Sequence, residues 1–113
     1  MKRTLFLISF IGCVTIALAQ ETEYVTKSDI HYFDENITDS DDYIKERCVL
    51  DIYYPKNIKD FATVVWFHGG GLTAGNKFIP SQLKEKGLCI VAVNYRLSPK
   101  VHSPVFIEDA AAA

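Results

Sequence analysis

A run of three glycines directly after a short apolar segment constrains this chain more than any other feature of its sequence. Residues 62–75 read ATVVWFHGGGLTAG, and the apolar part, residues 64–67, is β-branched and aromatic. Such a run, bounded by turn residues, predicts a fully buried strand. Gly69, Gly70 and Gly71 then give up side-chain packing and backbone order, at up to about 1 kcal/mol per residue relative to alanine. This cost is explained if backbone N–H groups must reach a small electron-rich group, for which an oxyanion is the leading candidate.

Three motifs, in chain order, resemble those of a known enzyme family. The strand followed by His68 and three glycines is similar to the oxyanion-hole motif of α/β-hydrolase esterases and lipases, which follows their third strand. Residues 91–99, VAVNYRLSP, are similar to the V-x-V-D/N-Y-R-L-A/S-P sequence at the end of the fourth strand. Pro104 and the IEDAA of residues 107–111 resemble the helix that leads to the nucleophile strand. From about residue 48 onward, the chain resembles the hormone-sensitive-lipase and bacterial feruloyl-esterase-like branch.

The resemblance implies a role for each residue of the glycine loop. Attack on an ester carbonyl builds negative charge on its oxygen, and each donor fixed around that oxygen contributes roughly 3 to 4 kcal/mol. The resemblance assigns this role to the N–H groups of Gly69 and Gly70, while Gly71 permits the sharp loop. The histidine of the motif, here His68, supports the loop through hydrogen bonds in that family and is not the catalytic base.

The catalytic triad is expected outside this sequence. No G-x-S-x-G occurs in it, and the order serine, acid, histidine in that fold places all three beyond residue 113. The fold needs roughly 250 residues or more, so residues 20–113 are expected to form its N-terminal part and to be inactive alone. Leu72 and Phe78 are candidates for lining an acyl or alcohol pocket, and packing beneath the loop explains them equally well.

The strands read along the chain agree with the N-terminal part of an α/β-hydrolase sheet. Residues 23–33 and 48–54 predict two antiparallel strands. Residues 64–67 and 88–95 predict two buried strands, which alternate with helices and therefore pair in parallel. The resemblance places the second strand antiparallel beside the fourth, and the third beside a fifth that would follow residue 113. The free edge of the third strand is therefore expected to promote association.

The connections are predicted from their turn and capping residues. The acidic segment 34–42 is expected to be a solvated hairpin loop. Calcium binding is the weaker alternative, because Lys45 stands where an EF-hand loop needs its glutamate. Residues 80–86 predict a short helix that begins with proline and is followed by glycine. Ser103 is the expected N-cap of the last helix, with Pro104 in its first turn.

The first 19 residues predict an export signal. Lys2 and Arg3 are followed by an apolar stretch to residue 18, and Ala-Leu-Ala before Gln20 fits the small-x-small cleavage rule. The apolar stretch is short for a membrane span, so cleavage and a periplasmic or secreted protein without stable membrane insertion are expected. An uncleaved anchor and lipidation at Cys13 are the weaker alternatives. Glycosylation at Asn36 would depend on the host.

Charge and glycine spacing argue against other classes of partner. A formal net charge of −2 gives no reason to expect nucleic acid. Residues 69–74 fit the dinucleotide pattern G-x-G-x-x-A formally, but no helix follows at once and Asn94 replaces the acid at the fourth strand. Residues 70–77 resemble a phosphate-binding P-loop, but Asn76 separates its glycine from its lysine. No cofactor or metal is expected, and the oligomeric state is left open.

The two cysteines beyond the signal are expected to be free and buried. Export would permit a disulfide between Cys48 and Cys89. Each begins a strand, and the resemblance makes these two strands antiparallel neighbours. The cysteines should then be roughly 15–20 Å apart at ~3.3 Å per residue, beyond the ~7 Å limit between bridged Cα atoms.

These observations predict an exported serine hydrolase of the carboxylesterase type, working through an acyl-enzyme. By resemblance, its substrates are acyl esters of small molecules or carbohydrates, including aromatic feruloyl-type esters. Formamide or peptide hydrolysis is the alternative among enzymes, because the same oxyanion loop serves any acyl transfer. The alternative outside enzymes is an inactive fragment or pseudoenzyme that acts as a binding module.

Overall fold

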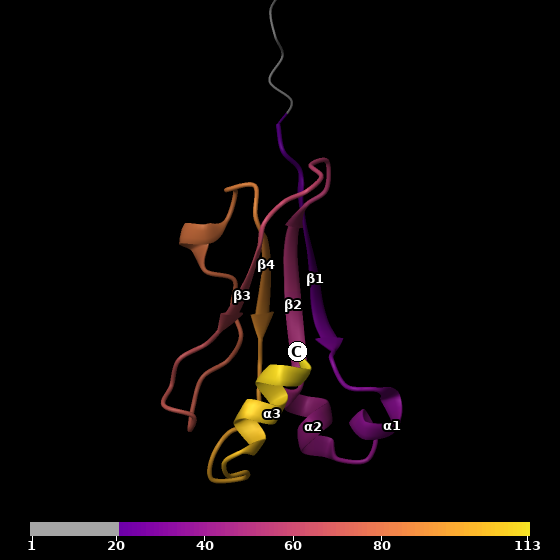
Figure 1. Cartoon of the computed structure of the whole chain (residues 1–113), viewed down its shortest axis with the longest axis vertical. Coiled ribbons are helices and arrows are strands. Elements are labelled where there is room, and N and C mark those ends of the chain that lie inside the picture. Colours follow the sequence, from indigo (N-terminus) through magenta and orange to yellow (C-terminus); the bar gives the residue numbers. More distant parts are fainter. Residues whose placement is uncertain (1–20) are drawn as a thin grey trace, which may run out of the picture.

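The computed structural model describes residues 21–113 of the chain. The predicted export signal, residues 1–19, lies outside them. The described part forms one sheet with short helices at one end (Figure 1). None of its helices has both the length and the apolar character needed to cross a membrane.

Four strands make a mixed sheet. β1 (Tyr24–His31) pairs antiparallel with β2 (Val49–Pro55), and β2 pairs antiparallel with β4 (Cys89–Val93). β3 (Thr63–Phe67) pairs with β4 in parallel, so the spatial order is β1-β2-β4-β3 (Figure 1). This arrangement confirms the predicted fold class, the N-terminal part of an α/β-hydrolase sheet with two antiparallel strands followed by a parallel pair.

The core lies on the two inner strands, β2 and β4, each of which has a neighbouring strand on both sides. On β4, Ile90, Ala92 and Val93 are fully buried. β3 has only one neighbour within residues 21–113, and its residues Val65 and Phe67 are 52% and 40% exposed. The prediction that β3 is a fully buried strand is therefore wrong for the part of the chain that the structure describes.

The acidic segment 34–42, predicted as a loop, contains the short helix α1 (Glu35–Thr38) and ends where α2 (Asp42–Arg47) begins. Asp41 caps α2, since its carboxylate accepts the backbone N–H groups of Tyr43 at 2.7 Å and Ile44 at 3.4 Å. Basic side chains occupy the last turn of α2, where the helix dipole favours positive charge. The loop prediction is wrong because an acidic composition does not show that one of its aspartates, Asp41, caps a helix.

The helix predicted over residues 80–86 is a single 3₁₀ turn, η1 (Ser81–Leu83). Two residues later Glu85 adopts a left-handed backbone with φ 58°, which ends any helical path. The N–H of Gly87 then donates to the hydroxyl of Tyr24 at 2.7 Å. A two-turn helix is marginal without packing, and this contact with β1 fixes a different path.

The last helix, α3 (Val105–Ala112), forms where it was predicted but has a different cap. Pro104 occupies the N-cap position and no side chain caps the helix, so the prediction of Ser103 as N-cap is wrong. The carbonyl oxygen of Pro104 accepts the N–H groups of Ile107 at 2.8 Å and Glu108 at 3.1 Å. These backbone bonds set the first turn without a side-chain cap.

The two cysteines within residues 21–113 are buried free thiols, as predicted. Cys48 directly precedes β2 and Cys89 is the first residue of β4. The antiparallel register pairs Leu50 with Val93, which places the cysteines at opposite ends of the two strands. Burial raises the pKa of the Cys48 thiol to about 11, so this thiol stays protonated at neutral pH.

Candidate active site

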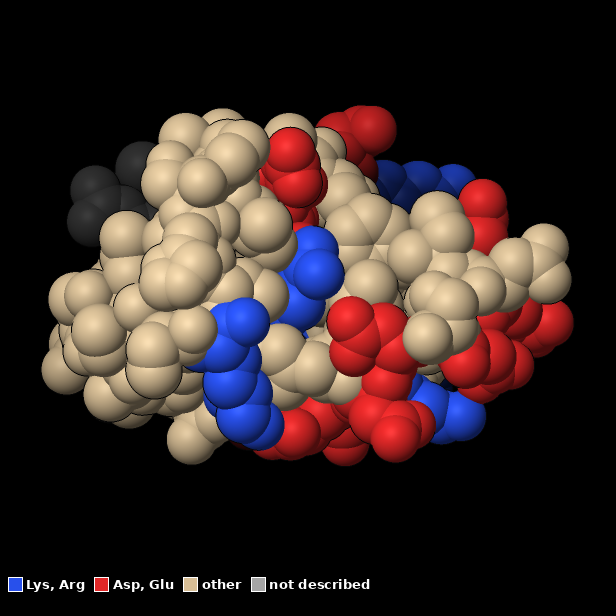
Figure 2. All heavy atoms as spheres, turned by 90° about the horizontal axis from the view of Figure 1, so that it is seen from below, with Lys and Arg blue, Asp and Glu red and all other residues tan. Residues whose placement is uncertain are grey.

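The glycine loop leaves β3 at the end of the sheet where β4 also finishes, and α1, α2 and α3 lie at the same end (Figure 1). Figure 2 looks onto this end of the molecule. Acidic side chains gather on one side of it, and the opposite side is largely uncharged. The acidic residues of the segment 34–42 are all exposed. The negative surface charge at this end therefore comes from α1, the start of α2 and the residues that connect them.

Two positions of the loop require glycine. Gly70 has φ 125° and Gly75 has φ 108°, in the region that side chains disfavour. A Cβ atom on Gly70 would overlap the carbonyl oxygen of Ala74, and one on Gly75 would overlap the carbonyl oxygen of Gly69. The two ends of the loop therefore approach each other more closely than any side chain permits.

The tip of the loop is a tight left-handed turn. Gly71 and Leu72 have φ 62° and 63° in succession. The carbonyl oxygen of Gly70 accepts the N–H of Thr73 at 3.2 Å, and that of Leu72 accepts the N–H of Ser98 at 2.8 Å. The turn is thus closed on itself and tied to the segment that follows β4.

The N–H groups of Gly69 and Gly70 donate to no acceptor within residues 21–113. Each belongs to a peptide unit whose carbonyl is held, because the Tyr95 hydroxyl donates to the His68 oxygen and the His68 ring donates from Nδ1 to the Gly69 oxygen, both at 2.8 Å. The carbonyl and N–H of a trans peptide point in opposite directions. The Gly69 N–H therefore points away from the Tyr95 hydroxyl, and the Gly70 N–H away from the His68 ring. The site offers two free donors of fixed direction.

His68 lies inside the hydrogen-bond network of the loop. His68 is 4% exposed, and its ring stacks on that of Tyr95 with the ring centroids 4.6 Å apart and an interplanar angle of 8°. Both ring nitrogens have neighbours, since Nδ1 bonds to the Gly69 oxygen and Nε2 lies 3.4 Å from Nη2 of Arg47. The ring is thus fully engaged in holding the loop.

Arg47, the last residue of α2, is a supporting residue that the sequence did not reveal. It is 7% exposed, and its guanidinium donates to the Tyr95 oxygen at 3.1 Å, the Asn76 Oδ1 at 2.7 Å and the Gly75 oxygen at 3.1 Å. Among residues 21–113 it pairs with no carboxylate. The only signal in the sequence is a basic residue just before a predicted strand, which does not distinguish a buried clamp from a surface charge.

Asn94 and Lys77 brace the far side of the loop. Asn94 Oδ1 accepts the backbone N–H of Lys77 at 2.5 Å. The Lys77 ammonium contacts Asp29 at 2.8 Å and Asp51 at 2.6 Å. Burial alone would lower the pKa of Lys77, but the hydrogen bonds to these two aspartates raise it. The ammonium is thus committed to carboxylates, which argues against the phosphate-loop interpretation.

A buried ion pair ties the end of β4 to α3. Asp109 is fully buried and accepts from Arg96 through Nη2 at 2.7 Å, Nε at 3.0 Å and the backbone N–H at 3.0 Å. This hydrogen bonding from Asp109 raises the pKa of Arg96. The carboxylate has no exposed oxygen for chemistry, so its role is to hold α3 against the sheet.

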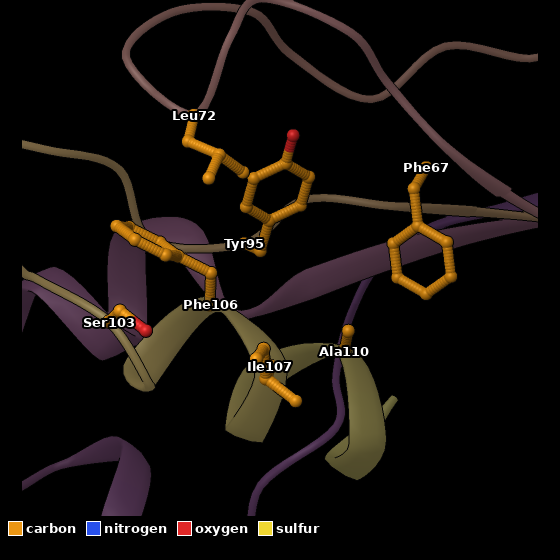
Figure 3. Close-up of a pocket in the computed structure, with 7 residues that line it drawn as sticks. All are labelled: Phe67, Leu72, Tyr95, Ser103, Phe106, Ile107 and Ala110. Carbon is orange, nitrogen blue, oxygen red and sulfur yellow. The ribbon is translucent and has the colours of Figure 1, made fainter.

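An apolar cavity of about 390 Å³ lies between the loop, β3 and α3 (Figure 3). It is lined by Phe67, Leu72, Tyr95, Ser103, Phe106, Ile107 and Ala110. Of the two residues proposed for a substrate pocket, only Leu72 reaches this cavity. Phe78 is 50% exposed and lies edge-on to Trp66, with ring centroids 5.8 Å apart.

The donors at this site are backbone groups. Within the described residues, no three His, Cys, Asp or Glu side chains lie where they could hold a metal ion. The arrangement can accept a small anion or a carbonyl oxygen that gains negative charge, because Gly69 and Gly70 present unpaired N–H groups.

Comparison with solved structures shows that this chain shares the fold of two proteins described as esterases. It is similar to the crystal structure of esterase B from Lactobacillus rhamnosis (HN001), with 22% identity and a TM-score of 0.60 over 79% of this chain and 28% of that one. It is also similar to a truncated form of a carbohydrate esterase from gut microbiota, with 24% identity and a TM-score of 0.57 over 83% of this chain and 33% of that one. The chain thus spans about a third of the length of these structures.

The sequence itself carries a family assignment. No curated protein matches the chain in sequence. The model of the BD-FAE family matches residues 50–113, which is more than half of the chain and includes the glycine loop, the end of β4 and α3. The chain belongs to the BD-FAE family.

Proposed function

We propose that this protein is a serine hydrolase of the carboxylesterase type, with the N–H groups of Gly69 and Gly70 as donors of its oxyanion hole. One observation carries the proposal: both N–H groups are unpaired within residues 21–113, and the carbonyl of each peptide unit is held by a hydrogen bond. Donors fixed in advance need no reorganisation when charge develops, which is the property that oxyanion stabilisation requires.

The proposed reaction passes through an acyl-enzyme. A serine attacks the ester carbonyl, the oxyanion forms against Gly69 and Gly70, the alcohol leaves, and water then hydrolyses the acyl-serine. Gly71 supplies the turn of the loop and His68 holds it. We place the serine, acid and histidine beyond residue 113 in a longer chain, because the sequence contains no G-x-S-x-G and the similar structures are about three times as long.

The proposed substrates are acyl esters of small molecules or carbohydrates. The apolar cavity beside the loop suits the acyl or aromatic part of an ester. Leu72 is the residue of the glycine loop that lines this cavity (Figure 3). One of the similar structures is described as a carbohydrate esterase, which makes acylated carbohydrate a first choice. Phe78 packs against Trp66 and receives no role in this pocket.

Export remains part of the proposal. Lys2 and Arg3, the apolar stretch after them and the Ala-Leu-Ala before Gln20 support a cleaved signal and a periplasmic or secreted enzyme.

Labelling of the intact protein with a fluorophosphonate tests this proposal. We expect one covalent adduct, located by mass spectrometry of the digest on the serine of a G-x-S-x-G segment, and hydrolysis of p-nitrophenyl and feruloyl esters. Replacing that serine with alanine should abolish both. The same spectra report the N-terminal residue, which cleavage of the signal would make Gln20.

Three outcomes separate the alternatives. Faster turnover of p-nitroanilides or formamides than of esters would assign peptide or formamide hydrolysis. A folded protein with neither adduct nor turnover would contradict the hydrolase and leave the binding module. An adduct together with ester turnover supports the carboxylesterase.

A further inference from the structure

We propose that Arg47 is a positioning residue that fixes the tautomer of His68 and thereby the direction of the Gly70 N–H. The inference rests on the proposed function, because the direction of this N–H matters to catalysis only if it binds an oxyanion. The hydrogen bonds themselves do not depend on that function. The buried guanidinium of Arg47 has four partners, and both ring nitrogens of His68 have a neighbour.

The neighbours of the His68 ring select one tautomer. A guanidinium has donors only, so Nη2 of Arg47, 3.4 Å from Nε2, needs a lone pair on that nitrogen. A carbonyl oxygen only accepts, so the Gly69 oxygen, 2.8 Å from Nδ1, needs a proton there. Both neighbours therefore require the neutral ring protonated at Nδ1.

The tautomer determines where the next N–H points. With its proton on Nδ1, His68 holds the Gly69 oxygen, and the trans peptide directs the Gly70 N–H the opposite way. With the proton on Nε2, Nδ1 would carry a lone pair facing the lone pairs of the Gly69 oxygen. The bond at 2.8 Å would become a repulsion, and the peptide unit would be free to rotate.

Arginine is suited to this position because its donors form a rigid fork. One planar group reaches the end of β4 through the Tyr95 oxygen, and the loop through Asn76, Gly75 and His68. A lysine offers one point charge on a flexible stem, and it cannot satisfy acceptors that lie along three sides of a planar group.

Close packing protects the bond between the ring and the peptide. A Cβ atom on Gly75 would overlap both the Gly69 oxygen and Nδ1 of His68, so the backbone of Gly75 lies directly against this bond. The Gly75 oxygen in turn accepts from Nη2 of Arg47 at 3.1 Å. Arg47 therefore holds the ring and also the backbone that covers it.

Nitrogen-15 NMR of the intact protein with labelled histidine tests the proposal. We expect His68 to show Nδ1 protonated and Nε2 unprotonated, as a single species, at neutral pH. His31 and His102 are exposed and serve as internal references that exchange tautomers in water. Substitution of His31, His68 and His102 by glutamine, one at a time, assigns their signals among those of the intact protein.

Substitutions of Arg47 should then change the tautomer. In Arg47→Met and in Arg47→Lys, we expect His68 to become a mixture of tautomers. We also expect kcat on esters to fall about 10- to 100-fold, the scale for small misplacements of catalytic groups, with little change in KM. Lys45→Met is the matched control, since Lys45 lies in the same helix and is exposed. It should leave the tautomer and the kinetics unchanged.

Several results would overturn the proposal. A wild-type His68 protonated at Nε2 contradicts it, even if no variant folds. A folded Arg47→Met protein that keeps the pure Nδ1-protonated form also contradicts it, as does rescue of kcat by lysine. Absence of any ester turnover in the wild type would refute the proposed function instead, because the tautomer is read without a substrate.

Discussion

Gly70→Ala should reduce kcat/KM on p-nitrophenyl esters by about 100- to 1,000-fold, the effect of removing one oxyanion-hole donor. The new Cβ would overlap the carbonyl oxygen of Ala74 and lie 2.6 Å from its carbonyl carbon, and both are backbone atoms. The backbone at Gly70 also has φ 125°, which alanine disfavours. The loop must therefore move, and the N–H of Gly70 moves with it.

Gly87→Ala is the matched control for the cost of a side chain on a left-handed backbone. Gly87 has φ 72° and no neighbouring atom within 4 Å of an added Cβ, and it precedes β4 outside the glycine loop. We expect it to lower stability by about 1 kcal/mol and to leave kcat/KM unchanged. A folded Gly70→Ala protein that hydrolyses esters at nearly the wild-type rate would remove Gly70 from the oxyanion hole.

Asp109→Ala should lower the free energy of unfolding by about 3–5 kcal/mol, the usual result of removing one partner of a buried ion pair. Asp109 is fully buried and accepts three kinds of donor from Arg96, whose side chain is only 14% exposed. Without the carboxylate, this guanidinium is left partly buried without a counter-charge. Urea denaturation of the intact protein measures the loss.

Two further variants show whether the loss comes from the stranded charge. Glu108→Ala changes the exposed neighbour in the same helix and should stay within about 0.5 kcal/mol of the wild type. The double variant Arg96→Met with Asp109→Leu should recover much of the loss, because it removes both charges. A loss below about 1 kcal/mol for Asp109→Ala would show that the pair does not anchor α3.

The sheet could be predicted because its information is local. The apolar runs of β3 and β4 are long enough to identify strands, and the glycines that follow β3 mark a loop with special backbone angles. Pairing and order came from the resemblance and were confirmed by the registers. The apolar pattern of β3 predicts burial, because an edge strand and a central one share that pattern. The free edge of β3 within the described residues is predicted only by the resemblance, which places its second neighbour beyond residue 113.

The errors arose where distant contacts decide the backbone. The turn η1 has the composition of a helix, but the contact between Gly87 and Tyr24 across 63 residues fixes another path. The acidic residues at the start of α2 are as typical of a solvated loop as of a helix, so the sequence does not indicate that Arg47 ends a helix. Leu72 and Phe78 looked equivalent in sequence, and only the turn at the tip of the loop separates them.

Support of the loop was the part of the site least visible in sequence. Tyr95 stands inside a recognised motif, but nothing in the motif shows that its hydroxyl holds the His68 oxygen while its ring stacks on the imidazole. Arg47 belongs to no motif. A buried guanidinium that bonds to carbonyls and an amide becomes apparent only when the ends of α2, β3 and β4 meet.

A crystal structure of the intact protein with a phosphonate bound covalently to its serine tests the account most directly. The phosphonate oxygen stands in for the oxyanion of the tetrahedral intermediate. We expect this oxygen at about 2.7–3.1 Å from the backbone nitrogens of Gly69 and Gly70. A phosphonate oxygen held by other groups, with both glycine N–H groups directed away from it, would contradict the proposed oxyanion hole.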